Sequence, residues 1–306
     1  MGSKTVFSDR SKEERGARLT TVDLSEFDVP GRGRGLLDVL RWRYLLRLLV
    51  RKGTATRYRN SVLGWTWSYV KPGIQFLVYW LVMGFIFGMD RGLENFPVYL
   101  FSGFVAVNFF NEAFGNATSS IVDNRALVKK IYLPRELFPI AAVWVAFVHF
   151  LPQLAILLVV CVLTGWIPTF AALGAALLGM LILGATSLGL GLFFAGLNVR
   201  FRDAQNFVEI LRMLATWASP VLYTWTLVAE KLPEWVLYVY MVNPLTIAVE
   251  YFHYAFWQPT IPDERFHGFA PHFELYTAGA VVLCAAFLVI GQLVFRRFER
   301  SFAQDL

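Results

Sequence analysis

The feature that most limits how this chain can fold is a set of long apolar stretches. A bilayer core of about 30 Å is crossed by about 20 helical residues. Six stretches of that kind occur, over residues 72–89, 96–122, 137–163, 170–197, 207–228 and 275–295, and the first can begin as early as 63. None alternates polar and apolar residues as a strand of a membrane barrel does. The sequence therefore predicts an all-α integral membrane protein with six transmembrane helices.

The composition agrees with a membrane protein and argues against a soluble globule. Of the 306 residues, 57% are hydrophobic and 16% are charged, whereas soluble domains have about 45–50% and about 25%. Too few polar residues remain to cover the surface of a water-soluble fold. Two cysteines exclude a disulfide scaffold, and their spacing from the four histidines suits no metal site. No catalytic residue or metal ligand is predicted.

The distribution of Lys and Arg predicts the orientation in the membrane. With the N-terminus in the cytoplasm, 25 of the 28 basic residues fall on the inner side and 3 on the outer side. Because cytoplasmic loops of membrane proteins carry the excess of Lys and Arg, both termini are expected inside. This asymmetry also accounts for the net charge of +6 without nucleic-acid binding. Residues 1–35 are polar, with no apolar core of a signal peptide, and are expected to form a flexible cytoplasmic tail.

Residues 36–60 are apolar but contain regularly spaced arginines. On a helical wheel, Trp42, Leu46 and Leu49 share one side, while Arg43 and Arg47 lie on another. This pattern predicts an amphipathic helix in the cytoplasmic interface of the membrane, with its arginines near lipid head groups. A short soluble helix packed on a partner protein is the alternative.

The region between the fifth and sixth apolar stretches is too long for a simple turn. Residues 235–242 and 245–257 are apolar but too short to span, and Asn243-Pro244 separates them. Segments of this length are typical of interfacial or re-entrant pieces, and the residue before a proline disfavours a helix. We therefore expect two short helices entering the membrane from the outer face.

The fourth stretch is rich in small residues. Ala185 and Gly189, and Gly191 and Ala195, have the spacing that places two small residues on one helix face. Such faces allow neighbouring membrane helices to approach closely. Helix packing is the expected role of these positions.

Four motifs together carry a family resemblance. They are RYRNSVLGWTWSYVKP at 57–72, NRALVKKIYLPRELFP at 124–139, LNVRFRDAQN at 197–206 and NPLT at 243–246. The chain after residue 36 resembles the permease subunit of ABC-2-type exporters. These exporters move lipid-linked polysaccharides or polyol phosphates, such as O-antigen, teichoic acid, capsule and mycobacterial galactan.

The resemblance implies a homodimer working with two copies of a separate ATPase in a bacterial plasma membrane. Residues 36–60 would be its interface helix and 61–306 its transmembrane domain, and the cargo would move from the cytoplasmic to the outer side. This sequence contains no Gly-x-x-x-x-Gly-Lys-Ser/Thr motif, the run that cradles nucleotide phosphates. ATP and Mg²⁺ would therefore be bound by the partner ATPase, and this chain is not expected to be an enzyme.

The loop at 124–139 is the expected contact with that ATPase. It is short and basic, and it carries apolar residues between its charges, as a helix that sits in a partner's groove does. Its candidate residues are Arg125, Lys129, Lys130, Ile131, Tyr132, Leu133, Pro134 and Arg135, to which the turn after the fourth stretch adds Arg202 and Asp203. The alternative is that the basic residues only fix the topology.

Aromatic residues on the first stretch could line a path for a sugar polymer. Aromatic faces can cover the C–H surface of a sugar while polar groups bind its hydroxyls. The residues within one narrow arc are Trp65, Tyr69, Phe76, Trp80 and Phe87; on the fifth stretch, Trp217, Tyr223 and Trp225 are secondary candidates. The alternative is a stripe that packs on neighbouring helices or faces lipid.

Polar residues in the second stretch form another candidate surface. Asn108, Glu112 and Asn116 lie one turn apart on one helix face, and an ionisable residue in a membrane usually faces a cavity or a partner. Hydrogen bonding between helices is an equally good alternative. At the outer side, Asn243, Pro244 and Glu250 in the two short helices are expected to act as a gate.

Two other functions remain open at this point. One is an ABC-2 exporter for drugs or lipids, which a path with fewer aromatic residues would favour. The other is a membrane-embedded glycosyltransferase or acyltransferase. That enzyme would need acidic or histidine catalysts near a membrane face, for which the outer acids Glu250, Asp263 and Glu264 are the candidates.

Overall fold

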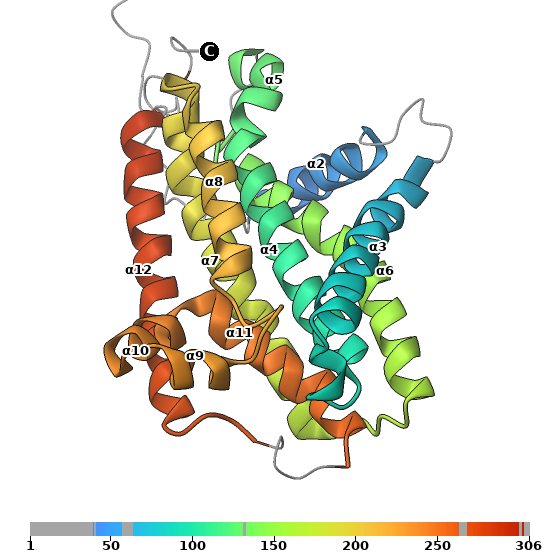
Figure 1. Ribbon diagram of the computed structural model, residues 1–306. Coiled ribbons are helices and arrows are strands. Elements are labelled where there is room, and N and C mark those ends of the chain that lie inside the picture. Colours follow the sequence, from blue (N-terminus) through green and yellow to red (C-terminus); the bar gives the residue numbers. More distant parts are fainter. Residues whose placement is uncertain are drawn as a thin grey trace, which may run out of the picture. The chain divides into compact units, whose positions relative to one another are not determined.

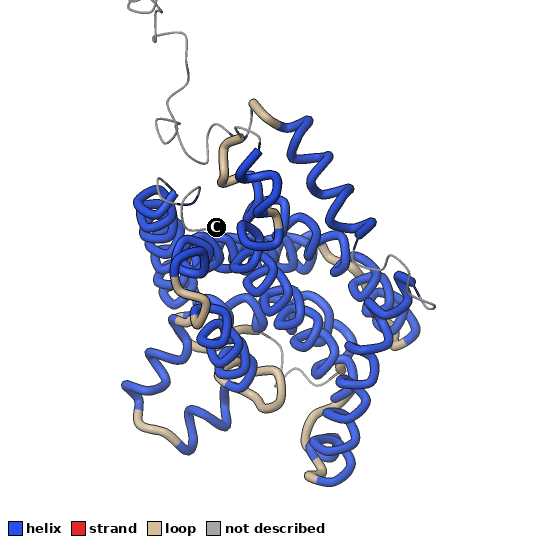
Figure 2. The backbone as a smooth tube through the Cα atoms, turned by 90° about the horizontal axis from the view of Figure 1, so that it is seen from above, coloured by secondary structure: helices blue, strands red, loops and turns tan. Residues whose placement is uncertain are grey.

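The computed structural model describes residues 39, 41–56, 64–130, 133–262, 268–299 and 302. Residues Arg34–Leu306 form one compact unit. Every regular element among the described residues is a helix, and no strand occurs among them (Figure 2). The predicted all-α class is therefore confirmed. The expected tail at 1–35 lies outside the described residues.

Four of the described helices are long and apolar enough to cross a membrane. They are the helix over Trp67–Ile86, made of α3 (Trp67–Tyr79) and the π-helical η4 (Trp80–Ile86), then α6 (Leu137–Leu163), α7 (Phe170–Arg200) and α12 (Phe273–Glu299). They correspond to the first, third, fourth and sixth predicted stretches. Apolar side chains such as Leu163 and Leu181 remain exposed on them, as expected of surfaces that contact lipid.

Helix α4 (Phe96–Asp123) forms the centre of the bundle and corresponds to the second predicted stretch. At 28 residues it is long enough to span. It packs against α6 and α7 on two sides (Figure 1), and most of its side chains are buried. Its polar residues, which lower its hydropathy, lie in protein surroundings where other helices can bind them.

The small residues of α7 bring three helices close together. A Cβ atom at Gly189 would lie 2.6 Å from the backbone carbon of Phe287 on α12, and one at Gly191 would lie 2.5 Å from the Cβ atom of Ala117 on α4. Because these distances are too short for a carbon atom, only the hydrogen atom of a glycine fits at the two positions. The prediction that Gly189 and Gly191 serve helix packing is confirmed. We call the contact between α7 and α12 the glycine seam.

The prediction of one continuous helix over 207–228 is wrong. Helix α8 (Ala204–Trp217) ends early, and α9 (Trp225–Lys231) begins only after a turn. Pro220 lacks the backbone N–H that a continuing helix needs, and it disfavours helical backbone at Ser219. With 14 residues, α8 is only about 21 Å long and cannot cross a bilayer core alone.

The carbonyl groups freed by this break have partners. The Tyr99 hydroxyl on α4 donates to the carbonyl oxygens of Pro220 and Tyr223, at 2.8 Å and 2.9 Å. The Thr246 hydroxyl donates to the carbonyl oxygen of Ala218 at 3.4 Å. In a membrane protein, irregular backbone is stable only where such partners replace water, so α4 and α11 (Pro244–Phe252) stabilise the turn.

Short helices follow α9, as predicted for the region after the fifth stretch. Helix α10 (Glu234–Val242) and α11 with η6 (His253–Trp257) match the predicted 235–242 and 245–257, and η7 (Gln258–Thr260) follows. The Asn243 side chain accepts a hydrogen bond from the Leu245 N–H at 3.1 Å and caps α11. The break at Asn243-Pro244 is confirmed, whereas entry of these helices into a membrane remains a prediction.

Helix α2 (Arg43–Thr56) lies within the predicted interface helix and runs across the long helices (Figure 1). It packs on α6, where a Cβ atom at Gly53 would lie 2.8 Å from Cγ2 of Val145. Tyr44 and Leu48 on α2 are exposed. The remaining short helices are η3 (Gly64–Thr66), η5 (Met89–Arg91) and α5 (Arg125–Lys130).

Candidate functional site

The interior of the bundle contains a carboxylate–histidine pair. Glu112 on α4 and His149 on α6 are joined by a contact of 2.6 Å between Oε1 and Nδ1. The His149 side chain is 1% exposed. Sequence reasoning singled out Glu112 but considered His149 only as a metal ligand. The available signal was the position of His149 within an apolar stretch, where an ionisable side chain needs a polar partner.

Helix α8 contributes polar groups to the same region. Asn111 on α4 donates to the Thr216 hydroxyl at 3.0 Å. The Arg212 guanidinium lies beside Gly115, where a Cβ atom would be 2.8 Å from Nη1, and it is close enough to Glu112 for the two charges to interact. We call the set of Asn108, Asn111, Glu112, His149, Arg212 and Thr216 the central polar cluster. Sequence reasoning had used Arg212 only for topology.

The central polar cluster is not fully hydrogen-bonded. Among the described residues, Nδ2 of Asn108, Oδ1 of Asn111 and Nε of Arg212 are buried without a partner. Buried polar atoms are usually paired. These unpaired atoms lie on two facing helices, α4 and α8, and retain the capacity to hydrogen-bond to water, to another polar group or to each other in a second arrangement of the side chains.

The aromatic stripe of the first span divides into packed and exposed parts. Phe76 packs edge-on against Phe101 of α4, with ring centroids 4.9 Å apart, and Tyr69 is half-buried. Trp80 is exposed, and Phe87 is 70% exposed. The Trp65 side chain is not among those that the structure describes. Packing therefore accounts for the middle of the stripe, and a path-lining role for its ends stays a prediction.

The aromatic candidates after α8 do not form one surface. Trp217 is 52% exposed at the end of α8. The Tyr223 hydroxyl donates to the Trp217 carbonyl oxygen at 2.6 Å and so helps to close the turn. Trp225 is half-buried at the first position of α9.

At the end of the bundle that carries α9 to α11, the predicted gate residues have separate surroundings. Asn243 caps α11, and Pro244 is buried at its first position. Glu250 is 5% exposed, with Oε1 3.3 Å from Nδ1 of His253. The His253 ring stacks on Tyr99, with centroids 4.0 Å apart. Sequence reasoning did not identify His253 or Tyr99 as partners of Glu250.

Helix α5 lies at the opposite end of the bundle (Figure 1). Arg125, Lys129 and Lys130 are exposed, while Val128 is buried in a hydrophobic cluster with residues of α4, α6, α7 and α12. Ile131 and Tyr132 lie outside the described residues. Val128 therefore fixes α5 to the bundle and leaves its charged face accessible.

The residues after α5 turn toward the bundle. Leu133 and Pro134 are half-buried. The Arg135 guanidinium donates to the Glu299 carbonyl oxygen and lies over the Phe302 ring, 5.6 Å from its centroid. Arg135 thus holds the end of α12.

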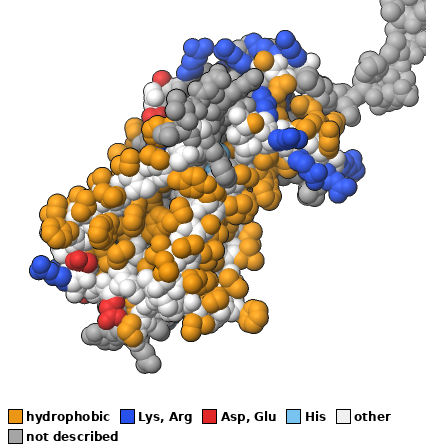
Figure 3. Space-filling model, turned by 90° about the vertical axis from the view of Figure 1, so that its right-hand side faces the viewer, with side chains coloured by type: hydrophobic (Ala, Val, Ile, Leu, Met, Phe, Trp, Pro, Cys, Tyr) orange, Lys and Arg blue, Asp and Glu red, His pale blue; other side chains and the backbone are white. Residues whose placement is uncertain are grey.

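The turn between α7 and α8 exposes the other candidate pair, Arg202 and Asp203. Figure 3 shows most of the Lys and Arg side chains in view gathered at one end of this face, beyond a broad area of hydrophobic side chains. This distribution matches the charge asymmetry of the sequence.

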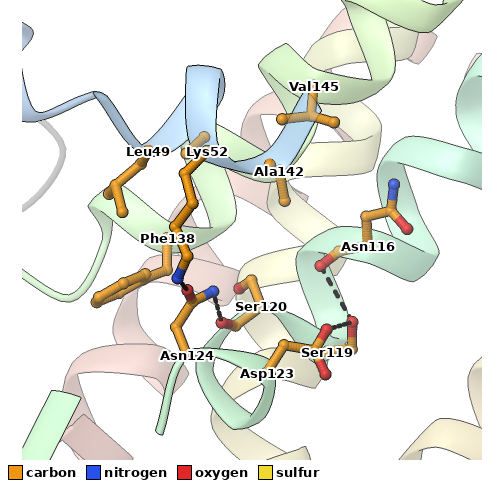
Figure 4. Close-up of a pocket in the computed structure, with 12 residues that line it drawn as sticks. Leu49, Lys52, Asn116, Ser119, Ser120, Asp123, Asn124, Phe138, Ala142 and Val145 are labelled. Carbon is orange, nitrogen blue, oxygen red and sulfur yellow. Dashed lines mark hydrogen bonds between the residues drawn. The ribbon is translucent and has the colours of Figure 1, made fainter. Parts of the chain in front are cut away.

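A polar pocket of about 480 Å³ lies between α2, α4 and α6 (Figure 4). The Lys52 ammonium donates to Oδ1 of Asn124 at 2.9 Å, and the Asn124 amide donates to the Ser120 carbonyl oxygen at 2.8 Å. Asn116 lines this pocket. The predicted face of Asn108, Glu112 and Asn116 is therefore shared between two places, the central polar cluster and this pocket.

The described residues contain no group of three or more His, Cys, Asp or Glu that could hold a metal ion. Both cysteines, Cys161 and Cys284, are buried and free.

Comparisons with known proteins connect this architecture to a transporter family. The ABC-2 type transporter family matches residues 44–257, which extend from α2 to the end of η6. The O-antigen export system permease protein RfbA of Myxococcus xanthus is 28% identical over 269 residues, covering 88% of this chain and 98% of that protein. Two proteins of the same name from Klebsiella pneumoniae are 25% and 24% identical over 265 residues, covering 86% of this chain and 95% of each.

Proposed function

The chain belongs to the ABC-2 type transporter family, and from that premise we propose that it is the membrane permease of an ATP-driven exporter of a lipid-linked polysaccharide. The observation that carries the proposal is the similarity to O-antigen export permeases over 95–98% of their length. A match of that extent covers the long apolar helices together with the loops that connect them. The cargo crosses the bacterial plasma membrane from the cytoplasmic to the outer side.

In this proposal, the chain passes the membrane six times with both termini in the cytoplasm. The end carrying α5 is cytoplasmic, because most Lys and Arg lie on that side in the sequence. The fifth pass is α8 together with the turn that follows it. Helices α9 to α11 enter from the outer face, and residues around Asn243, Pro244 and Glu250 form the outer gate.

Two copies of the chain work with two copies of a separate ATPase, which binds ATP and Mg²⁺. Arg125, Lys129 and Lys130 on α5 are suited to contact that ATPase, because they are exposed while Val128 anchors the helix. The neighbouring Ile131 and Tyr132 complete the contact, and the exposed Arg202 and Asp203 form a second one. The bond between Lys52 and Asn124 links α2 to the residue that precedes α5.

The path for the polymer runs between the two copies, along surfaces that are exposed in the single chain. Exposed aromatic side chains at Trp80, Phe87 and Trp217 support this choice, because such faces can slide along sugar rings. The central polar cluster supplies polar groups within the membrane. Movement in one direction requires that ATP binding favours one arrangement of the helices over the other.

Reconstitution in vesicles tests the proposal. The chain is inserted together with a candidate ABC ATPase, and a radiolabelled lipid-linked polysaccharide is supplied on the ATPase side. Delivery of label to the opposite side is expected only with ATP and both proteins. The control contains an ATPase with its P-loop lysine replaced. Delivery by the chain alone, or synthesis of a glycosidic bond by the chain alone, would contradict the proposal, and the second result would favour the transferase.

A further inference from the structure

A second pocket lies at the end of the bundle that carries α9 and α11. Its volume is about 380 Å³, within the range of about 300–1,000 Å³ that small-molecule sites occupy. Its walls come from the end of the first span, from α4, from the start of α9 and from α11, at Phe87, Tyr99, Trp225 and Glu250. Four parts of the chain that are far apart in sequence therefore meet around one cavity.

The carboxylate in this pocket is fixed in position. Oε1 of Glu250 contacts Nδ1 of His253 at 3.3 Å, and His253 is held by stacking on Tyr99. Tyr99 is itself held by its hydrogen bonds to the turn after α8. No other hydrogen bond to the Glu250 carboxylate is found among the described residues, so Oε2 is available to accept one from a ligand. A buried carboxylate held in this way is a pre-organised acceptor.

Hydroxyl and aromatic groups surround the carboxylate. The hydroxyls of Thr224 and Thr226 lie 2.6 Å apart, so one hydrogen serves their mutual bond and the other can be donated to a ligand. Trp225 stands between them in sequence and is half-buried, and Phe87 is largely exposed. The pocket thus combines hydrogen-bonding groups with aromatic faces, the combination that suits a sugar ring.

The charge of the pocket selects among sugars. Glu250 lines it, and none of the described residues lining it is Lys or Arg. A carboxylate accepts hydrogen bonds from neutral hydroxyls but repels a phosphate or a uronate. We propose that this pocket is a binding site for an uncharged sugar residue of the exported polymer, at the outer end of the path. This inference rests on the proposed function and adds a substrate class to it.

Ligand-detected NMR on the full-length chain in detergent tests the site. The probes are maltose, cellobiose, lactose and melibiose as neutral disaccharides, and cellobiouronic acid as the acidic counterpart of cellobiose. At least one neutral disaccharide is expected to bind, and cellobiouronic acid to bind at least about tenfold more weakly than cellobiose. Glu250→Gln is expected to reduce that preference, because it removes the repelling charge while it keeps the shape.

Two tryptophan variants make the test specific. Trp225→Ala removes an aromatic face of the pocket and is expected to weaken disaccharide binding about tenfold. Trp235→Ala is the matched control, since Trp235 lies on α10, is exposed and does not line the pocket; binding should be unchanged. Absence of binding by every neutral disaccharide, or equal binding by the wild type and Trp225→Ala, overturns the inference.

ATP-driven delivery in the vesicle assay separates this inference from the proposed function. If the wild-type chain transports a lipid-linked polymer but binds no neutral disaccharide, only the sugar site is wrong. If disaccharides bind as expected but no ATPase drives transport, the exporter proposal fails while the site remains.

Discussion

The glycine seam and the contact between α4 and α8 are both helix–helix contacts, but different forces hold them. At the seam, α7 and α12 approach until only hydrogen fits at Gly189, and the polar groups that meet there, the Thr186 hydroxyl and the Cys284 thiol, are paired with each other at 3.0 Å. Between α4 and α8, the contact is made by amide, hydroxyl and guanidinium groups, and some of these are buried without partners. Close packing permits one arrangement of two helices, whereas an incompletely paired polar contact permits more than one. The difference predicts that α7 and α12 form the more rigid frame and that α8 is the element more able to move.

The largest effect is expected from Gly189→Ala. The added Cβ atom would meet the backbone of α12 at 2.6 Å, and backbone cannot turn aside as a side chain can. The variant should lose about 3 kcal/mol of stability or fail to fold, measured as thermal unfolding and as yield of monodisperse protein in detergent. Gly184→Ala is the control, because no atom lies within 4 Å of its Cβ position. Equal stability of both variants would show that the seam is not rigid.

The next largest effect is expected in the central polar cluster. Glu112→Gln keeps the shape but removes the charge that faces His149 at 2.6 Å. A hydrogen bond to a charged group contributes about 1.5–3 kcal/mol, and a loss within that range is expected in thermal unfolding. Because the change lies beside α8, the rate of ATP-driven polymer delivery should fall more than stability alone accounts for.

Gln153→Glu, at a buried position of α6, provides a comparison for Glu112→Gln on α4. It adds a carboxylate one turn from His149 without touching α8. It should destabilise the chain without the additional loss of transport. Full transport by Glu112→Gln would remove this pair from the mechanism.

A smaller effect is expected at the turn after α8. Tyr99→Phe removes the hydroxyl that binds the carbonyl oxygens of Pro220 and Tyr223 but keeps the ring that stacks on His253. A neutral hydrogen bond contributes about 1 kcal/mol, so unfolding should shift by roughly that amount. Amide hydrogen exchange should increase at residues 218–224 and remain unchanged in α7. Uniform exchange across both would show that the turn and the seam do not unfold independently.

The sequence predicted the elements whose signals are local. Asn243-Pro244 interrupts two short apolar runs, and the structure breaks there with Asn243 as the cap. Ser219-Pro220 carries the same kind of signal, but the apolar residues on both sides led to the prediction of one continuous span. Hydropathy averages over a window and does not register a break whose carbonyl groups are bound by residues as distant as Tyr99.

The candidate site was less predictable, because its side chains depend on distant partners. Glu112 stood out as an acid within an apolar stretch, but its pairing with His149 joins two helices and appears in neither stretch alone. Arg212 lies within the fifth predicted stretch and counted only toward the charge asymmetry, whereas its guanidinium lies beside Gly115 of α4. The glycine spacing of α7 was predictable, because small residues at that spacing serve the same purpose in many membrane helices.

The smallest effect on stability, together with a clear effect on coupling, is expected at Lys52. Its ammonium binds Oδ1 of Asn124 at the end of α4, and exposed polar contacts of a Lys contribute only about 0–1 kcal/mol. Lys52→Met keeps the length of the side chain but removes the bond between α2 and the residue before α5. ATP hydrolysis by the assembled transporter should continue while polymer delivered per ATP decreases.

Arg47→Met, which removes a charge from α2 with no resolved contact to Asn124, serves as the matched control for Lys52→Met. It should leave the ratio of delivery to hydrolysis unchanged. An equal decrease in both variants would mean that the charge of α2, acting on lipid head groups, matters more than its link to α5. An unchanged ratio in both would place α2 with the rigid frame of α7 and α12 and leave α8 alone as the moving element.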